Sequence, residues 1–301
     1  MTQASAAQVN NAASAPLQNA PQKGIALGFI GGLVISFDVP FIRLAGSDPW
    51  LMMALRGGIL AIIFLAYWYF ARPKNMPAKP FRNPAWVMVA IIYGLNNIFF
   101  TLAVYNTSTA NLVFILAFNS MAAAIFSWWL IGEKPKVHTW IAIALTIFGV
   151  GLIVQNGLSS GSFLGDAFAL ICAISLGYGV TLTRKSGVDM SLAPGFGGLV
   201  SVLFALPLIV AYSSAPQSWF FAISNAALIV PIAAFCLALA PSFIPAPQAA
   251  MFYLLETVLA PVWIWIVFGE IVETTTLIGG AIILMALFGH SYLSVKQTQK
   301  A

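Results

Sequence analysis

Charged residues are scarce in this sequence: only 7% of its 301 residues are Asp, Glu, Lys or Arg, whereas 60% are hydrophobic. Soluble domains have about 25% charged residues. A chain with so few could not cover a globule of this size with a solvated surface, and its apolar content is too high for an intrinsically disordered protein. The composition therefore excludes both classes and favours an integral membrane protein.

Cysteine and histidine are also scarce, with two of each in the chain. Cys172 and Cys236 lie within apolar runs, so we interpret them as small packing residues rather than as a disulfide. His138 and His290 are far from each other and from the cysteines along the chain. We therefore expect no metal site and no cofactor.

Long apolar runs are abundant. A helical membrane crossing takes about 20 residues, and Gly, Pro and charged residues divide this chain into ten such runs. The sequence therefore predicts an all-α integral membrane protein embedded in a lipid bilayer. The ten predicted transmembrane helices lie near residues 24–45, 50–70, 85–105, 109–130, 137–155, 164–183, 191–212, 219–240, 245–268 and 274–293.

The basic residues predict the orientation of these helices. The net charge of +5 does not indicate nucleic-acid binding, because the 13 Lys and Arg residues are dispersed over short connections. If the amino terminus is cytosolic, only Arg43 lies toward the opposite side, and Arg56 lies within the second predicted helix. The other eleven lie on the cytosolic side: Lys23, Arg72, Lys74, Lys79, Arg82, Lys134, Lys136, Arg184, Lys185, Lys296 and Lys300. Because cytoplasmic connections carry the excess of Lys and Arg, this distribution predicts that both termini are cytoplasmic.

The two ends of the chain are polar. Residues 1–22 contain no Lys or Arg and no apolar core, so they lack the features of a secretory signal. We expect a disordered cytosolic tail over residues 1–22 and a second, short tail over residues 296–301.

The sequence also contains an internal repeat. At an offset of 137 residues, the aligned identities are Gly132 with Gly269, Glu133 with Glu270 and Trp128 with Trp265. The halves, residues 23–156 and 157–295, would each hold five predicted helices. Since five is odd, the second half enters the membrane from the opposite side, and the halves form inverted repeats. This architecture is common in secondary transporters, whose substrate sites lie where the repeats meet.

Several short stretches carry a resemblance to a known family. These are residues 47–56 (SDPWLMMALR), 103–110 (AVYNTSTA), 130–134 (LIGEK), 148–151 (FGVG), 255–263 (LETVLAPVW) and 268–270 (FGE). In their order and spacing the chain resembles the drug/metabolite transporter superfamily, in its ten-helix, two-repeat EamA-type branch. The resemblance implies a plasma-membrane carrier that exports amino acids or other small metabolites without ATP hydrolysis. Consistent with this, the sequence has no GxxxxGK[ST] motif.

The chain departs from that family at two places. Ser36, Phe37 and Asp38 replace the Trp-Gly pair common in the family's first helix, and the proline often found in the fourth helix is absent near Asn119. Both positions lie where the family's cavity would be, so the family's familiar substrates do not transfer to this chain.

Three ionisable residues are expected at bilayer depth: Asp38, Arg56 and Glu256. A charge at bilayer depth costs at least about 2.5–3.5 kcal/mol, which makes each a candidate functional residue. Asp38 and Arg56 lie at similar depth on adjacent antiparallel helices. They form either a buried ion pair that fixes the two helices or a gate or substrate anchor near the outer mouth.

Glu256 lies near the bilayer midplane, where no basic residue is available, and its repeat counterpart is Asn119. Two interpretations remain open. In one, Glu256 is a protonated, hydrogen-bonded carboxyl that couples transport to protons. In the other, it faces a water-filled cavity and meets a cationic group of the substrate.

Further polar and aromatic residues share helix faces with these positions. Tyr93 and Asn97 lie four residues apart, and Tyr253 and Trp263 share the face of Glu256. The asparagines serve either as hydrogen-bond partners between helices or as ligand contacts. The predicted substrate-binding or gating residues are Asp38, Arg56, Tyr93, Asn97, Asn119, Tyr253, Glu256 and Trp263.

These features predict a secondary active transporter that exports a small polar or zwitterionic metabolite, with an amino acid as the expected class, by alternating access coupled to protons. The alternative is an exporter of organic cations or drugs, with Glu256 and nearby aromatic residues forming the pocket. A membrane-embedded enzyme is less favoured, because its catalytic groups would have to converge, whereas the three ionisable residues lie at two depths. We therefore predict no catalytic residues.

Overall fold

The computed structural model describes residues 21–71, 80–132, 137–160, 162–187, 189–244, 246–269 and 272–298. Within these residues the chain is helical and has no β-strand. The expected tail over residues 1–22 lies outside the described part up to residue 20, and α2 begins at Pro21. The last helix runs to Thr298, three residues beyond the expected end of the second repeat.

The helices of the first half are mostly long. They are α2 (Pro21–Ile35), α3 (Asp38–Ala45), α4 (Pro49–Ala71), the short 3-10 helix η1 (Pro80–Arg82), α5 (Pro84–Asn106), α6 (Thr109–Leu116), α7 (Asn119–Ile131) and α8 (Val137–Ser160).

The second half follows a similar course. It consists of α9 (Phe163–Ser186), α10 (Ala193–Tyr212), α11 (Trp219–Ser224), the π-helical segment η2 (Asn225–Ile229), α12 (Val230–Leu239), the 3-10 helix η3 (Ala240–Ser242), α13 (Ala246–Met251), α14 (Leu254–Phe268) and α15 (Thr274–Thr298).

Seven spans within the described residues are long and apolar enough to cross a membrane. They are Gln22–Ala45, Pro49–Phe70, Pro84–Asn106, Thr109–Ile131, Phe163–Ser186, Ala193–Tyr212 and Trp219–Ser242. The outward-facing side chains of the bundle are also apolar: Val210 and Phe70, for example, are 89% and 82% exposed. Lipid, rather than water, is the solvent that such a surface requires, and the chain is an integral membrane protein.

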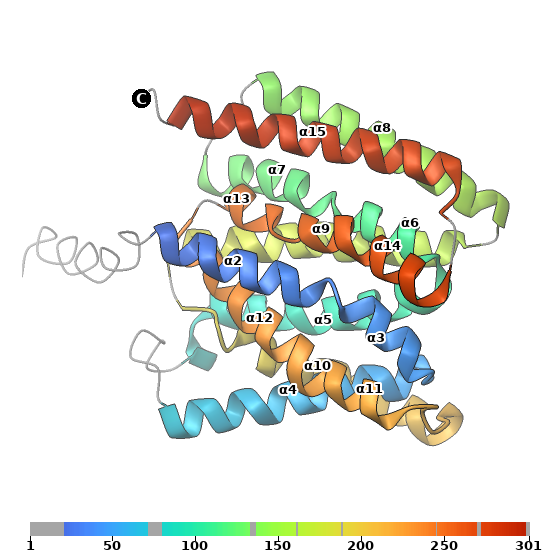
Figure 1. The fold of residues 1–301 in the computed structure, drawn as a ribbon. Helices are drawn as coiled ribbons and strands as arrows, with labels where there is room; N and C mark the ends of the chain where they lie inside the picture. Colours follow the sequence, from blue (N-terminus) through green and yellow to red (C-terminus); the bar gives the residue numbers. More distant parts are fainter. Residues whose placement is uncertain are drawn as a thin grey trace, which may run out of the picture.

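The helices lie side by side and run in roughly the same direction across the bundle (Figure 1). The start of α2 and the end of α15 lie at the same end of the bundle, which we call the terminal end. The opposite end, where α3 finishes and α6 and α11 begin, is called the far end. The helices α8 and α15 pack against each other at one edge of the bundle, and α4 packs against α10 near the opposite edge.

Three of the predicted continuous helices are interrupted in the structure. The first breaks at Ser36 and Phe37, between α2 and α3, where the Ser36 hydroxyl donates to the Leu33 carbonyl oxygen (2.7 Å). Such bonding back to the preceding turn bends helices. The fourth breaks at Ala117 and Phe118, between α6 and α7.

The third interruption lies between α13 and α14, at Phe252 and Tyr253. The sequence analysis predicted each of these three crossings as one continuous helix. The structure places additional breaks within the crossings, at the depth of the polar residues.

Glycines bring α4 and α10 unusually close. A Cβ atom on Gly57 would lie 2.5 Å from the carbonyl oxygen of Gly198, which is too short for any real contact, and it would also overlap the Ser201 hydroxyl. Only glycine permits this approach of two backbones. This contact places Ser201 of α10 close to the polar residues of α4 and α5.

Two helices end in the same way in the two halves of the chain. Gly132 follows α7 with φ 85°, and Gly269 follows α14 with φ 67°. In both, the glycine N–H donates to a tryptophan carbonyl oxygen, that of Trp128 or Trp265. Glycine is favoured there because the left-handed conformation strains other residues. The glutamates that follow each glycine, part of the proposed repeat, lie outside the described residues.

Candidate functional site

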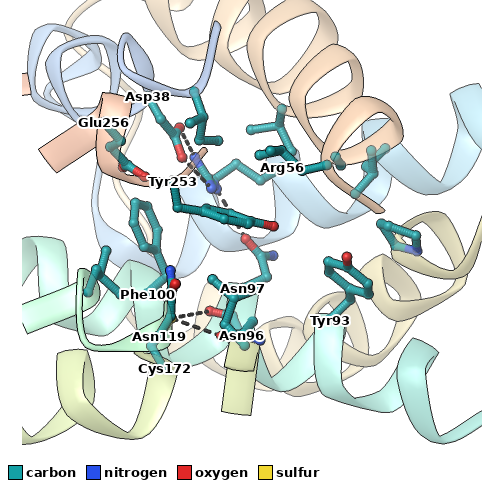
Figure 2. A pocket seen from close by; sticks show the side chains of 18 of the residues that line it. Asp38, Arg56, Tyr93, Asn96, Asn97, Phe100, Asn119, Cys172, Tyr253 and Glu256 are labelled. Carbon is teal, nitrogen blue, oxygen red and sulfur yellow. Dashed lines mark hydrogen bonds and ion pairs between the residues drawn. The ribbon is translucent and has the colours of Figure 1, made fainter. Parts of the chain in front are cut away.

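A cavity of about 120 Å³ lies inside the helix bundle. Its polar lining residues are Asp38, Arg56, Tyr93, Asn96, Asn97, Asn119, Cys172, Tyr253 and Glu256, most of which Figure 2 shows around one space. Its other walls come from Ile35, Leu60, Phe100, Leu116, Leu176, Pro194, Gly198, Val230, Ala234 and Leu237. Seven of the eight predicted site residues therefore lie together at one cavity, and their roles stay predictions.

The three helix breaks meet at this cavity. Asp38 is the first residue of α3 and Asn119 the first of α7, so each directly follows a break. Tyr253 lies within the third break, and Glu256 is in the first turn of α14. Discontinuous helices are the usual means by which transporters place polar groups at mid-membrane depth. The breaks thus explain how residues from distant parts of an apolar sequence converge.

The buried charges Asp38 and Arg56 form an ion pair. The guanidinium donates from both terminal nitrogens to the carboxylate, with 2.9 Å between Nη2 and Oδ2. Asp38 is 1% exposed and Arg56 5% exposed. Of the two interpretations of these residues, the structure shows the geometry of the buried pair.

Two asparagines complete the partners of this pair. Asn225 accepts from Nη1 of Arg56 (2.9 Å), and its amide donates to the Asp38 carboxylate (2.6 Å) and carbonyl oxygen (3.1 Å). Asn97 accepts from Nε of Arg56 (3.1 Å). The Phe100 ring centroid lies 5.2 Å from Arg56 Cζ, within the range of a cation–π contact. Four of the five N–H groups of a guanidinium thus donate to described residues.

Asn97 also ties three helices together. Its amide donates to the Ser201 hydroxyl of α10 (2.8 Å) and to the Met53 carbonyl oxygen of α4 (3.2 Å). Both the oxygen and the nitrogen of the Asn97 amide therefore have partners on other helices. This is the arrangement expected if the asparagine serves as a hydrogen-bond partner between helices.

A second group of polar residues at the cavity has side-chain atoms without hydrogen-bond partners among the described residues. Glu256 Oε1, both amide atoms of Asn119 and Nδ2 of Asn96 have no hydrogen-bond partner among the described residues. All three side chains are buried, at 4%, 0% and 8% exposure respectively. Buried polar atoms are almost always paired in proteins. Four unpaired atoms at one cavity therefore indicate a place where a ligand or water completes the hydrogen bonding.

Comparisons with known proteins give the family. Residues 22–155 match the EamA-like transporter family. An uncharacterized transporter, YdeK of Bacillus subtilis (strain 168), is 26% identical over 201 residues, which cover 64% of this chain and 67% of that protein. Residues 22–155 therefore form an EamA-like transporter domain, and both comparisons support membership of the drug/metabolite transporter superfamily. A protein of known crystal structure shares its fold with a TM-score of 0.67 at 17% identity, over 90% of this chain and 98% of that one.

The family match and the similarity to a transporter support a membrane transporter and point away from an enzyme. The residues around the cavity should therefore be considered as groups that bind and release a substrate. The described residues contain no group of three or more His, Cys, Asp or Glu side chains that could hold a metal ion.

Trp263 is the predicted site residue that does not line the transporter's cavity. Its indole N–H donates to the Ser36 hydroxyl (3.2 Å), and its ring stacks on Phe37 with 4.9 Å between centroids. Trp263 thus contacts both residues of the break between α2 and α3. Any effect it has on the substrate would be exerted through that break.

Besides Asn96, the sequence analysis missed three residues of the transporter's polar interior. Asn225 lies in an apolar run, and only its polarity within that run could have marked it. Cys172, interpreted as a packing residue, lines the cavity and donates from its thiol to Asn96 Oδ1 (2.9 Å). Asp166 is a fourth buried ionisable residue, 0% exposed, which lies outside the cavity.

Proposed function

We propose that this EamA-like transporter is a secondary active carrier that exports a small polar or zwitterionic metabolite, with an amino acid as the expected class, by alternating access. The observation that carries the proposal is the set of unpaired buried atoms on Glu256, Asn119 and Asn96 at one cavity. A transporter must bind its substrate with polar groups that are not already paired within the protein. The unpaired atoms of Glu256, Asn119 and Asn96 meet this condition among the described residues.

The chemistry of the unpaired atoms favours a substrate that has both donors and acceptors. The Glu256 carboxylate suits an ammonium group, since no basic residue pairs with it among the described residues. The free amide N–H groups of Asn119 and Asn96 suit an acceptor such as a carboxylate. The mostly apolar remaining walls, including Phe100 and Leu60, would contact the rest of a small molecule.

We further propose ten transmembrane crossings arranged as two inverted five-helix repeats. Beyond the seven long spans, apolar helical stretches occur at Trp140–Gly149, Leu254–Phe268 and Thr274–Ala286. The matched glycine ends of α7 and α14 support the repeat, as do the breaks that precede each of these helices. In this arrangement the terminal end faces the cytoplasm, the far end faces the outside, and the carrier resides in the plasma membrane.

Glu256 is the residue that we propose for proton coupling. An ionised carboxylate with no counter-charge is costly at this depth. Either a proton or a cationic substrate group removes that cost, and the two cannot occupy the same carboxylate at once. Exchange of one for the other at Glu256 would couple outward substrate movement to inward proton movement.

The test is transport by the Glu256→Gln variant in proteoliposomes with an imposed pH gradient. We expect normal expression but loss of uphill transport, because glutamine cannot exchange a proton. The matched control is Glu273→Gln, an exposed residue beyond the cavity lining, which should transport as the unmodified protein does. Undiminished proton-driven flux in Glu256→Gln would refute the coupling role.

A second candidate is an exporter of organic cations. It is favoured by one observation: Asp38 neutralises Arg56, so the remaining charge at the cavity is that of Glu256. The same vesicles distinguish the two candidates if an amino acid is compared with the amine that lacks its carboxyl. A cation carrier would transport the amine at least as well, whereas a zwitterion carrier would prefer the amino acid.

A further inference from the structure

The buried carboxyl of Asp166 belongs to no part of the cavity and has no role in the mechanism above. It lies in the first turn of α9, at the far end of the bundle, and is 0% exposed. Its Oδ1 accepts from the Thr107 hydroxyl (2.5 Å) and, at 3.4 Å, from the Asn111 amide. Its Oδ2 is buried and has no partner among the described residues.

The groups around Asp166 join several elements at this end. Asn111 of α6 accepts from the Thr276 hydroxyl of α15 (3.0 Å), so the carboxyl is linked to the junction of α5 and α6, to α6 itself and to the start of α15. The next turn of α6 receives a hydrogen bond from α14, where Thr257, the neighbour of Glu256, donates to the Val113 carbonyl oxygen (3.0 Å). The hydrogen bonds around Asp166 and the bond from α14 therefore attach to neighbouring turns of α6.

The surroundings provide no counter-charge for an ionised Asp166. No described Lys or Arg forms an ion pair with it. Of the elements packed against the start of α9, the end of α5 contributes Tyr105, and Glu273 directly precedes α15. The described parts of α6, α7 and the second half of α8 contain no titratable residue. An ionised carboxylate with one unpaired oxygen is unstable in such surroundings.

The packing also restricts what could neutralise the carboxyl. A Cβ atom on Gly165, the preceding residue, would overlap the backbone of Asn106 and Thr107. Since α9 and the junction of α5 and α6 are in direct contact there, a metal cation with its several oxygen ligands does not suit the site. A proton requires no such space.

We propose that Asp166 is a second proton-binding site of this transporter and that its proton holds the far end closed. The proton enters from the water at that end and neutralises the carboxyl, which permits the buried arrangement with Thr107 and Asn111. When α6 moves away and water reaches Asp166, the carboxylate ionises and the proton returns to that water. Acidity on that side would thus favour the closed far end, independently of Glu256.

The test measures the opening of the far end against pH. Spin labels on cysteines introduced at Asn106 and Ala215, both exposed at that end, report the distance across it in lipid nanodiscs, with the two native cysteines replaced. We expect the population with the shorter distance to rise as the pH falls. In Asp166→Asn, which mimics the protonated carboxyl, the shorter distance should dominate at every pH. The matched control Asp189→Asn alters another buried aspartate, at the terminal end, and should retain the pH response.

A second variant keeps the proposal testable if Asp166→Asn does not fold. Thr107→Val removes the hydroxyl that donates to the Asp166 carboxylate. The protonated form of Asp166 should therefore be favoured, and the pH midpoint of the distance change should move upward by about one pH unit. An unmoved midpoint, a full pH response in Asp166→Asn, or a distance that follows sodium concentration at fixed pH would each overturn the proposal.

Discussion

Arg56 makes more side-chain hydrogen bonds than any other described residue of the cavity, and its partners are other residues of the protein. Its guanidinium contacts Asp38, Asn225 and Asn97, which come from three separate segments of the chain. One N–H is left for a substrate. Arg56 therefore serves first as a structural junction, and a single substitution there cannot be interpreted as a loss of substrate recognition alone.

The pair is best tested by a double-mutant cycle. Arg56→Gln leaves the Asp38 carboxylate buried without a counter-charge, and we expect it to destabilise the fold by about 3–5 kcal/mol. Asp38→Asn combined with Arg56→Gln should recover a large part of that loss, since neutral amides can still hydrogen-bond each other. Denaturant unfolding in mixed micelles measures both effects. If the loss in the double variant equalled the sum of the losses in Asp38→Asn and Arg56→Gln alone, the two charges would not interact.

At the scale of whole elements, the close approach of α4 and α10 depends on Gly57. Gly57→Ala forces the backbones apart, and we expect a loss of about 1–3 kcal/mol. Gly58 is the matched control, because a Cβ atom there would lie 3.6 Å from Val202, an ordinary contact. Gly58→Ala should be neutral or slightly stabilising, since alanine favours helix over glycine by about 1 kcal/mol. Thermal unfolding of the two variants side by side provides the measurement; equal losses would mean that the backbone contact is unimportant.

The sequence predicted most helix ends within a few residues, because Pro49, Pro84 and the glycines after α3, α7 and α14 mark them. It did not predict the internal breaks. Ala117 and Phe118 are neither glycine nor proline, so the local sequence does not mark the break at these residues.

The polar site was likewise predictable only in part. Isolated polar residues such as Glu256 and Asn119 stand out in an apolar sequence. Which of them are paired depends on how separate helices meet, as with Asn225 and Arg56, and no local pattern encodes that. Asp166 was missed because its place near a helix end makes it look like a solvated residue, whereas α6 and the junction of α5 and α6 cover it.

At the scale of the whole molecule, the orientation of the bundle follows from its basic residues. We expect a fluorescent protein fused after residue 301 to fold and fluoresce, and alkaline phosphatase fused there to be inactive, because the proposed topology places both termini in the cytoplasm. Fusions truncated at Ala215, in the connection after α10, should give the opposite result. Active phosphatase at the end of the full chain would reverse the proposed topology.

The neutrality of the Asp38–Arg56 junction has a consequence for how the carrier responds to voltage. A pair of opposite charges that moves together transports no net charge, so the membrane potential, worth about 2.3 kcal/mol per charge per 100 mV, does no work on it. The electric field would act on Glu256 and on whatever occupies it. If each crossing occurs with that carboxylate neutralised, the protein itself contributes no gating current, and any voltage dependence of the flux belongs to the cargo.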